Sequence, residues 1–328
     1  MPPKKSGEFE IIARYFAPLA VGVPGALGLT DDVAFLDVSE GEELVAKTDS
    51  VVASVHFLPD DPPDLIARKV LRRNLSDLAA KGAVPRWYLL DAAFPKGVGD
   101  AWIAGFARGL AHDQAEFDVS LVGGDTKATP GLATFGITLL GVVRAGSGLR
   151  RNGARVGDEI YVTGTIGDAA LGLLARRGRL RFLKPRQRDA LIGRYRLPQP
   201  RVALGPHLLG VASASIDVSD GLVADLGHLC ETSKLAGVIE EARVPLSPPA
   251  RAALARRPQL IAQVLTGGDD YEILFTAPAA AANTLERLAG ELKVPITRIG
   301  RMTAGKGVTV LDAEGRARKL ARPGWTHF

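Results

Sequence analysis

The residues of this 328-residue chain that are best suited to chemistry are aspartates set among glycine, serine, threonine and other small residues. Six such clusters occur, at residues 30–32, 48–50, 74–77, 123–126, 217–221 and 267–270. Most of them adjoin an apolar run typical of a strand, so we expect the carboxylates at strand ends. Mg²⁺ binds through a few carboxylates together with water and substrate phosphates. Because neighbouring carboxylates repel one another unless cations neutralise them, the clusters indicate a magnesium site.

Each cluster taken alone has a plain alternative, because aspartate beside glycine is common in turns and at helix N-termini. Six clusters in one chain are much harder to explain by turns. The pair Gly123-Gly124 follows the apolar run 119–122. Glycine there lets a backbone approach a phosphate and point N–H groups at it, and a tight turn is the alternative interpretation.

Other catalytic chemistries have weaker support. None of the five histidines is spaced with another as a pair of metal ligands. Cys230 is the only cysteine, which excludes an internal disulfide and a cysteine zinc cluster, and its apolar neighbours predict a core position. Residues 300–306 match the Gly-x-x-x-x-Gly-Lys phosphate-binding loop. Gly307 stands where that loop needs Ser or Thr, so we reject this motif.

Charge is distributed unevenly along the chain, whose formal net charge is +5. Residues 1–149 hold 14 Lys and Arg against 19 Asp and Glu, whereas residues 150–201 hold 13 against 4. The basic segment is dominated by arginine and is suited to attract phosphates, nucleotides or nucleic acid. A solvated basic surface is an equally good interpretation of it.

Strand-like and helix-like runs are mixed along the chain, which predicts an α+β or α/β fold. We expect helices at 7–18, 62–81, 100–117, 222–231 and 279–292, and one from Asp168 onward. We expect strands at 33–38, 44–55, 87–94, 119–122, 132–143, 159–163, 215–218, 271–276, 296–301 and 307–312. The small residues at 145–148 divide the chain into expected domains 1–148 and 149–328.

Targeting and membrane signals are weak. The first eight residues include no apolar stretch that could serve as a signal peptide. The longest uncharged apolar-rich run, 132–143, is too short to span a bilayer. We therefore expect a cytoplasmic location and no membrane partner.

Taken together, seven segments resemble in wording and order those of the thiamine-monophosphate kinase family, a member of the aminoimidazole-ribonucleotide-synthetase-like superfamily of ATP-binding enzymes. They are 48–57 (TDSVVASVHF), 74–80 (NLSDLAA), 123–126 (GGDT), 151–154 (RNGA), 162–168 (VTGTIGD), 217–222 (DVSDGL) and 267–272 (GGDDYE). Each segment is modest alone, but seven in order are highly specific. The resemblance extends from about residue 7 to the C-terminal segment 324–328.

The resemblance implies an α+β, two-domain, PurM-like architecture. An N-terminal mixed sheet with helices on one side would bind ATP and Mg²⁺ and dimerise, and a C-terminal α/β-type domain would complete the active-site cleft. The implied reaction is ATP-dependent phosphorylation of thiamine monophosphate to thiamine diphosphate, the final step of thiamine diphosphate biosynthesis, by in-line transfer with several Mg²⁺ ions. The resemblance also implies a homodimer whose N-terminal strands pair across subunits, and no nucleic-acid partner.

Motif position carries the family's site residues onto this chain. The implied Mg²⁺ ligands are Asp31, Thr48, Asp49, Asp77, Asp125, Asp217 and Asp220. The implied ATP contacts are Gly124, Asp125, Arg151 and Ser219, and the implied thiamine-substrate contacts are His56, Asp269 and Trp325. Among these, Asp77, Asp125, Arg151 and Asp220 are the expected catalytic residues.

Three positions depart from the family pattern. Lys47 stands where relatives often have Ser or Thr beside the metal-binding Thr-Asp pair. Ala107 replaces an aromatic residue that relatives can use against the nucleotide, so the adenine contacts must differ. Asp269 replaces the usual Glu, which shortens the side chain by one methylene and allows a water-mediated contact.

Other functions stay open on the residues alone. Another enzyme of the superfamily could use ATP to activate an amide or a selenide, although selenide chemistry would call for a reactive N-terminal cysteine and this chain has only Cys230. A non-catalytic nucleic-acid binder would use the basic segment, with strongly salt-dependent affinity. That function leaves the ordered aspartates unexplained.

Overall fold

The computed structural model describes residues 7–325, which form two compact units. One unit comprises the chain up to Leu78 together with Val84–Gly146, and the other comprises Ala79–Ala83 together with the chain from Ser147. Each unit has its own sheet and its own buried apolar residues. None of the described helices is long and apolar enough to cross a lipid bilayer.

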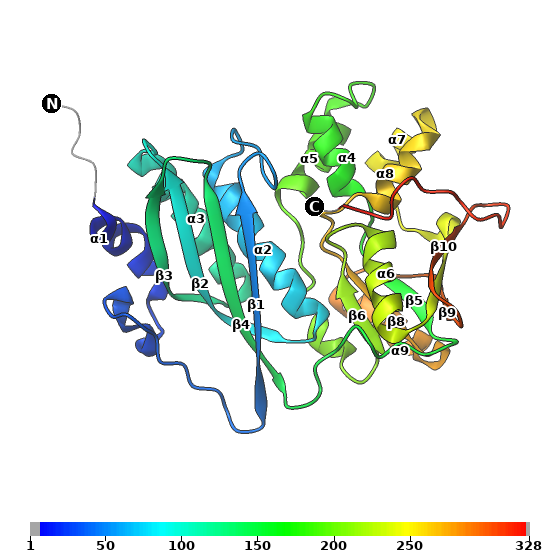
Figure 1. Cartoon of the computed structure of the whole chain (residues 1–328), viewed down its shortest axis with the longest axis horizontal. Coiled ribbons are helices and arrows are strands. Elements are labelled where there is room, and N and C mark those ends of the chain that lie inside the picture. The colour runs from blue at the N-terminus through cyan, green and yellow to red at the C-terminus, as the bar shows by residue number, and fades with distance from the viewer. Residues whose placement is uncertain (1–6, 326–328) are drawn as a thin grey trace. The chain divides into compact units, whose positions relative to one another are not determined.

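The first unit is built on a four-stranded mixed sheet in the order β1-β4-β2-β3 (Figure 1). Its strands are β1 (Glu42–Val52), β2 (Val84–Pro95), β3 (Ser120–Thr129) and β4 (Thr134–Arg144). β4 is antiparallel to both β1 and β2, whereas β2 and β3 are parallel. A helix joins β2 to β3, because parallel neighbours need a crossover connection.

Helices α2 (Pro63–Ala80) and α3 (Asp100–Phe117) cover one face of this sheet. Along β2, Tyr88, Leu90 and Phe94 are buried and their odd-numbered neighbours are not, because alternate side chains of a strand point to opposite faces. On the helix side, the Phe106 ring lies 4.5 Å from that of Phe135 and 6.1 Å from that of Phe94. On the other face, Trp87 and Leu89 of β2 pack in a small apolar cluster with Ala20 and Ala26 of the N-terminal turns.

The chain before β1 consists of short helical segments and an extended stretch. The segments are α1 (Glu8–Ile11), a π-helical turn (Ile12–Phe16) and 3-10 turns (Ala17–Ala20, Pro24–Leu29). The strand predicted at 33–38 is wrong, since these residues are extended but pair with no strand of the described chain. Ala34 and Leu36 pack in a small apolar cluster, while Val33 and Phe35 are exposed. The alternation in the sequence is thus satisfied by packing without strand pairing.

The second unit is built on a six-stranded sheet in the order β10-β7-β9-β5-β8-β6 (Figure 1). Its strands are β5 (Glu159–Thr163), β6 (Ala214–Asp217), β7 (Ala236–Glu240), β8 (Ile273–Ala277), β9 (Ile296–Thr303) and β10 (Gly307–Leu311). β10 and β7 are parallel, and the other neighbours are antiparallel.

Apolar clusters lie on both faces of this second sheet. Ile160 and Val162 of β5 belong to one cluster, and Tyr161 between them belongs to another that includes Leu285. The helices are α4 (Asp168–Arg176), α5 (Pro185–Arg196), α6 (Leu222–Ser233), α7 (Pro248–Arg256), α8 (Ile261–Thr266) and α9 (Ala282–Leu292). Short 3-10 turns occur at Gly205–Leu208, Glu241–Arg243, Pro258–Leu260 and Ala279–Ala281. Cys230 of α6 is fully buried, as predicted, and burial raises the pKa of its thiol to about 11.

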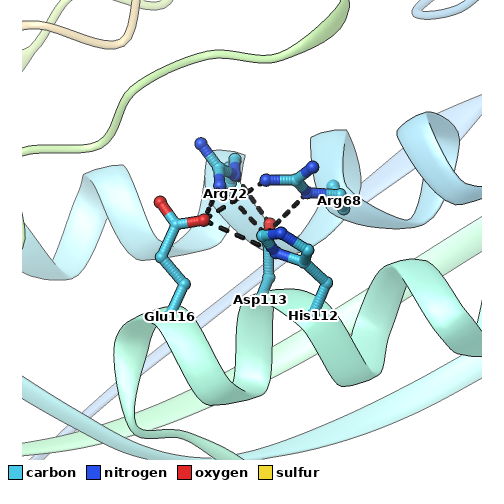
Figure 2. A network of polar contacts seen from close by, with 5 residues as sticks. All are labelled: Arg68, Arg72, His112, Asp113 and Glu116. Carbon is cyan, nitrogen blue, oxygen red and sulfur yellow. Dashed lines mark hydrogen bonds and ion pairs between the residues drawn. The ribbon is translucent and has the colours of Figure 1, made fainter.

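A buried ion network joins α2 to α3 (Figure 2). Arg72 donates to both carboxylate oxygens of Asp113, at 2.7 and 2.9 Å, and Arg68 donates to the same carboxylate at 2.7 Å. Both arginines also donate to Glu116, and His112 Nδ1 lies 3.3 Å from Asp113 Oδ1. The side chains of Asp113 and Arg72 are 0% and 1% exposed, so paired charge offsets the cost of removing Asp113 from water.

We predict that Asp113→Asn lowers the free energy of unfolding by about 3–5 kcal/mol, because it removes the buried charge that Arg68 and Arg72 share and leaves only the partly exposed Glu116 against them. Urea unfolding measures the loss. Glu291→Gln is the matched control, since the Arg287–Glu291 pair is 62% and 55% exposed, and we expect a change below about 0.5 kcal/mol. Equal losses in the two variants would contradict this account of the network.

Candidate active site

Two adjacent ion pairs link β1 to α2 in the first unit. Lys47 Nζ lies 3.1 Å from Asp77 Oδ2, and Arg73 Nη2 donates to Asp49 Oδ2 at 2.9 Å. Lys47 and Asp49 are two residues apart on the strand, and Arg73 and Asp77 are one turn apart on the helix. The structure therefore brings the two candidate ligands Asp49 and Asp77 to the same face of the sheet, each against a cation of the chain itself.

Thr48, between Lys47 and Asp49, belongs to the opposite face. Its Oγ1 accepts a hydrogen bond from Thr138 Oγ1 at 3.1 Å, across the β1–β4 pair. Strand alternation thus separates the side chains of Thr48 and Asp49, although they are neighbours in the motif.

Asp125 lies on the face of the first sheet that also carries Thr48. Beside it lies a second acid, Asp91, which was not predicted from the sequence. Asp91 of β2 is in register with Asp125 of β3, and Lys127 forms ion pairs with both, at 2.7 Å to Asp91. The hydrogen bond to Asp125, followed by that to Asp91, raises the pKa of the Lys127 amine. Three strand spacings of about 4.8 Å separate β3 from β1, so Asp125 is not brought next to Thr48 within one unit.

Position 124 requires glycine because β2 and β3 approach each other closely there. Its φ is +149°, and a Cβ there would lie 1.9 Å from the backbone oxygen of Leu90. The turn interpretation of Gly123-Gly124 is therefore wrong, because β3 continues through the pair as far as Thr129.

Asp31 and His56 lie in irregular segments on either side of β1. Asp31 is exposed, and its Oδ1 accepts from the N–H of Asp32 at 2.8 Å. His56 is half-buried, and its Nδ1 accepts from the N–H of Val52 at 3.0 Å. That hydrogen bond leaves Nε2 as the protonated nitrogen of the neutral ring.

In the second unit, Asp225 holds the loop that follows β6. One oxygen, Oδ2, accepts from the N–H groups of Ser219, Asp220 and Gly221, at 3.0, 3.0 and 3.1 Å. Burial, together with the charges of Asp217 and Asp220, raises the pKa of Asp225 well above its usual range. Because these N–H groups are already used, a nucleotide contact by Ser219 has to come from its side chain or its carbonyl group.

The loops of the 217–222 and 267–272 motifs are joined by backbone hydrogen bonds. The N–H of Asp269 donates to Ser219 O at 2.9 Å, and the N–H of Tyr271 donates to Val218 O at 2.8 Å. The N–H of Trp325 donates to Asp220 O at 3.0 Å. The structure therefore gathers the backbone of Asp217–Asp220, Asp269 and Trp325 from three distant segments.

The 267–272 loop is strained. Asp269 and Tyr271 have φ values of 72° and 53°, in the left-handed region that costs a non-glycine residue about 1–2 kcal/mol. The Tyr271 hydroxyl donates to Asp269 Oδ1 at 3.0 Å. Strain of this kind persists where surrounding contacts hold it, and it is common at functional sites.

Arg151 lies apart from these loops within its unit. Its carbonyl group accepts from Ser233 Oγ at the end of α6, and the carbonyl of Arg150 accepts from Ser215 N near the start of β6. Asp220 lies at the other end of both elements, where β6 ends and α6 begins.

Part of the basic segment has structural contacts. Arg194 and Arg201 donate to the buried Glu272, and Arg188 Nη1 donates to Leu183 O at 2.7 Å. These guanidinium groups pair within the second unit, so the basic segment is more than a solvated surface.

Two further groups of side chains have the residue types of metal ligands, but they contain carboxylates that already accept hydrogen bonds from the protein. The His112, Asp113 and Glu116 group is the ion network of Figure 2, whose carboxylates accept from Arg68 and Arg72. In the group of Asp220, Asp225 and His228, Asp225 Oδ2 already accepts three N–H groups.

Comparison with known proteins connects both units to one family. The AIR synthase related protein N-terminal domain matches residues 30–143, and the C-terminal domain of the same family matches residues 155–313. The thiamine-monophosphate kinase of Caulobacter vibrioides is 42% identical over 98% of this chain and 90% of its own length. That of Escherichia coli K12 is 41% identical over 98% of both chains.

Solved structures agree with these relationships. The thiamine-monophosphate kinase of Stenotrophomonas maltophilia K279a has a TM-score of 0.81 at 40% identity, covering 88% of this chain and 90% of its own. The structure of AaThiL complexed with AMPPCP and TMP has a TM-score of 0.78 at 31% identity, covering 98% and 97%. Hydrogenase maturation protein HypE in complex with ATP, at 21% identity and TM-score 0.78, covers 95% and 93% and shares the fold.

These matches confirm the predicted resemblance and the α+β, two-domain fold class. They cover most of the chain in the comparison of sequences and in the comparison of structures. The chain belongs to the thiamine-monophosphate kinase family, within the AIR synthase related proteins.

Proposed function

We propose that this chain transfers the terminal phosphoryl group of ATP to thiamine monophosphate, which yields thiamine diphosphate and ADP in the final step of thiamine diphosphate biosynthesis. The observation that carries the proposal is the match over 98% of the chain to a structure complexed with AMPPCP, an ATP analogue, and TMP. The curated relatives at 41–42% identity are named for the same activity.

The chemistry of this reaction fits the residue types of the candidate site. The acceptor is a phosphate monoester whose second pKa is near 6, so it is largely ionised at neutral pH and needs no general base. The main barrier is to bring two polyanions into line, which is a matter of positioning and charge neutralisation.

The candidate metal ligands suit a hard divalent cation, because all of them offer oxygen. The residues that would hold Mg²⁺ are Asp31, Thr48, Asp49, Asp77, Asp125, Asp217 and Asp220, and we add Asp91 for its place beside Asp125. A divalent cation held by these residues would supply positive charge against the phosphate groups. Lys47 and Lys127 lie against Asp77 and Asp125, which supports a site that attracts cations.

We assign the remaining site residues by motif and by position. Gly124, Asp125, Arg151 and Ser219 would contact ATP, and His56, Asp269 and Trp325 would contact the thiamine substrate. The Trp325 side chain is 47% exposed on a segment fixed to Asp220, which suits a flat ring stacked against a cationic thiazolium. Asp77, Asp125, Arg151 and Asp220 would act on the transferring phosphoryl group.

We also propose that the protein works as a cytoplasmic homodimer, with residues 1–148 as the nucleotide-binding and dimerising domain and residues 149–328 completing the site. The stretch 33–38 supports pairing across subunits, because its sequence alternates as in a strand and it pairs with no strand of its own described chain. Its Val33 and Phe35 side chains are 55% and 69% exposed, which a second subunit would cover.

The direct test is a product assay. We expect the protein, ATP, Mg²⁺ and thiamine monophosphate to give thiamine diphosphate and ADP in equal amounts, measured by chromatography. Absence of product, with free thiamine or a purine precursor phosphorylated instead, would reject the proposed function.

We predict that Lys47→Ser lowers the Mg²⁺ concentration needed for half-saturation by up to about fivefold, because a half-buried ion pair that competes for Asp77 is worth up to about 1 kcal/mol. Calorimetric Mg²⁺ titration in the presence of AMPPCP measures this without turnover. The control is Lys96→Ser, which removes an exposed lysine of the same unit. A weaker Mg²⁺ affinity in Lys47→Ser would show instead that the lysine supports the site.

We expect Trp325→Ala to raise the KM for thiamine monophosphate about 2- to 30-fold, the range that corresponds to a cation–π contact of about 0.5–2 kcal/mol. The KM for ATP should stay within about twofold of the parent, because the ring is assigned to the other substrate. Trp325→Phe should recover most of the affinity. An unchanged KM in Trp325→Ala would leave the ring without a binding role.

A further inference from the structure

Glu272 is a fully buried acid to which the proposed reaction gives no task. Its Oε2 accepts from Arg201 Nε at 2.6 Å and from Thr163 Oγ1 at 2.6 Å. Its Oε1 accepts from Arg201 Nη2 at 2.6 Å and from Arg194 Nη2 at 2.9 Å. Two guanidinium groups and a hydroxyl group therefore fix the position of this carboxylate.

The partners of Glu272 come from separate elements, so the carboxylate ties the loop to the body of the unit. Arg194 lies on α5, Arg201 in the segment after it, and Thr163 at the end of β5. The hydroxyl of Thr163 also accepts from the N–H of Ile273 at 2.8 Å, which fixes the first residue of β8 to β5.

The backbone of Glu272 also connects these contacts to the loops of the 217–222 and 267–272 motifs. The carbonyl group of Glu272 accepts from Val218 N at 2.8 Å, and Tyr271 N donates to Val218 O at 2.8 Å. On the other side of Tyr271, the buried Asp270 carboxylate accepts from Gly167 N and Ala169 N at 2.7 and 3.1 Å. The strained Asp269–Tyr271 segment is thus held at its middle residue by Asp270 and at its C-terminal end by Tyr271 and Glu272.

We propose that Glu272, held by Arg194, Arg201 and Thr163, is a positioning residue that fixes Asp269 for the thiamine substrate. This proposal rests on the function proposed above. The left-handed conformations of Asp269 and Tyr271 are disfavoured for an unrestrained chain, so their persistence requires such a restraint. Without it the loop relaxes, and a side chain displaced by about 1 Å loses much of its contribution to substrate positioning.

The test combines Glu272→Gln with Asp269→Asn in a double-mutant cycle. Glutamine keeps the shape of the side chain and removes the charge that faces the two guanidinium groups. We expect Glu272→Gln to raise the KM for thiamine monophosphate about tenfold and to change the KM for ATP less than about twofold. In the Asp269→Asn background the same substitution should add less than about twofold, because its effect passes through Asp269.

The control is Glu159→Gln, which removes the charge of an acid of β5 in the same unit, one that accepts from Arg298 Nε at 2.6 Å. It reports on lost stability alone, and we expect its KM values to match the parent. Thermal unfolding of each variant monitors folding. Should Glu272→Gln not fold, Arg201→Lys keeps the positive charge, removes the paired donation, and should give an increase of about threefold in the same KM.

Some outcomes would overturn the positioning role. They are an unchanged KM in folded Glu272→Gln, parallel increases in both KM values, or a full increase in the Asp269→Asn background. Failure of the unmodified protein to form thiamine diphosphate would reject the proposed function instead. The two failures are therefore distinguished by the first assay of the series.

Discussion

The cost of burying a carboxylate is the constraint on which the loops of the second unit depend. An ionised carboxylate removed from water costs several kcal/mol unless donors surround it. Asp225 meets the requirement with three backbone N–H groups, Asp270 with two, and Glu272 with two arginines and a threonine. The donors to Asp270 and Glu272 belong to segments far apart in sequence, so satisfying these carboxylates also determines how the segments are arranged. The donors to Asp225 lie only four to six residues before it, so this carboxylate fixes a local loop.

The two units treat their acids differently. In the first unit, Asp77 and Asp125 face the amines of Lys47 and Lys127, long side chains that are 34% and 48% exposed and can move away. In the second unit, the donors to Asp225 and Asp270 are backbone groups that cannot leave without unfolding the loop. In the first unit, the lysines beside the acids can therefore be replaced by other cations. In the second unit, the backbone donors hold the acids and the loops in fixed positions.

The sequence predicted those parts of the molecule whose signals are local. Aspartate beside small residues predicted the loops at 217–221 and 267–270, but the clusters 48–50, 74–77 and 123–126 lie inside β1, α2 and β3, so their expected place at strand ends is wrong. Apolar periodicity predicted α3 at 100–117 and β5 at 159–163 with the observed bounds. β7 and α7 were missed, because Gly237 weakens a short strand pattern and Pro248 opens a helix of only nine residues.

The residues missed at the site depend on tertiary register. Asp91 and Asp225 lie in an ordinary strand and an ordinary helix, and only the pairing of β2 with β3 and the fold of the 218–221 loop bring them to the candidate ligands. The stretch 33–38 shows the converse, since its alternation suits a strand but it pairs with no strand of the described chain. The residue types of the candidate site were thus predictable from the sequence. The side chains and backbone groups that contact each of them were not.

The three N–H groups that donate to Asp225 distinguish this loop from phosphate-binding loops that use such groups for the ligand. Three consecutive amides that converge on one oxygen atom form the kind of concave nest in which many nucleotide-binding proteins seat a phosphate. Here the chain supplies a carboxylate oxygen of its own to that nest. A nucleotide bound beside this loop must therefore be held through cations and side chains. Its affinity then depends on the ionic composition of the surrounding solution.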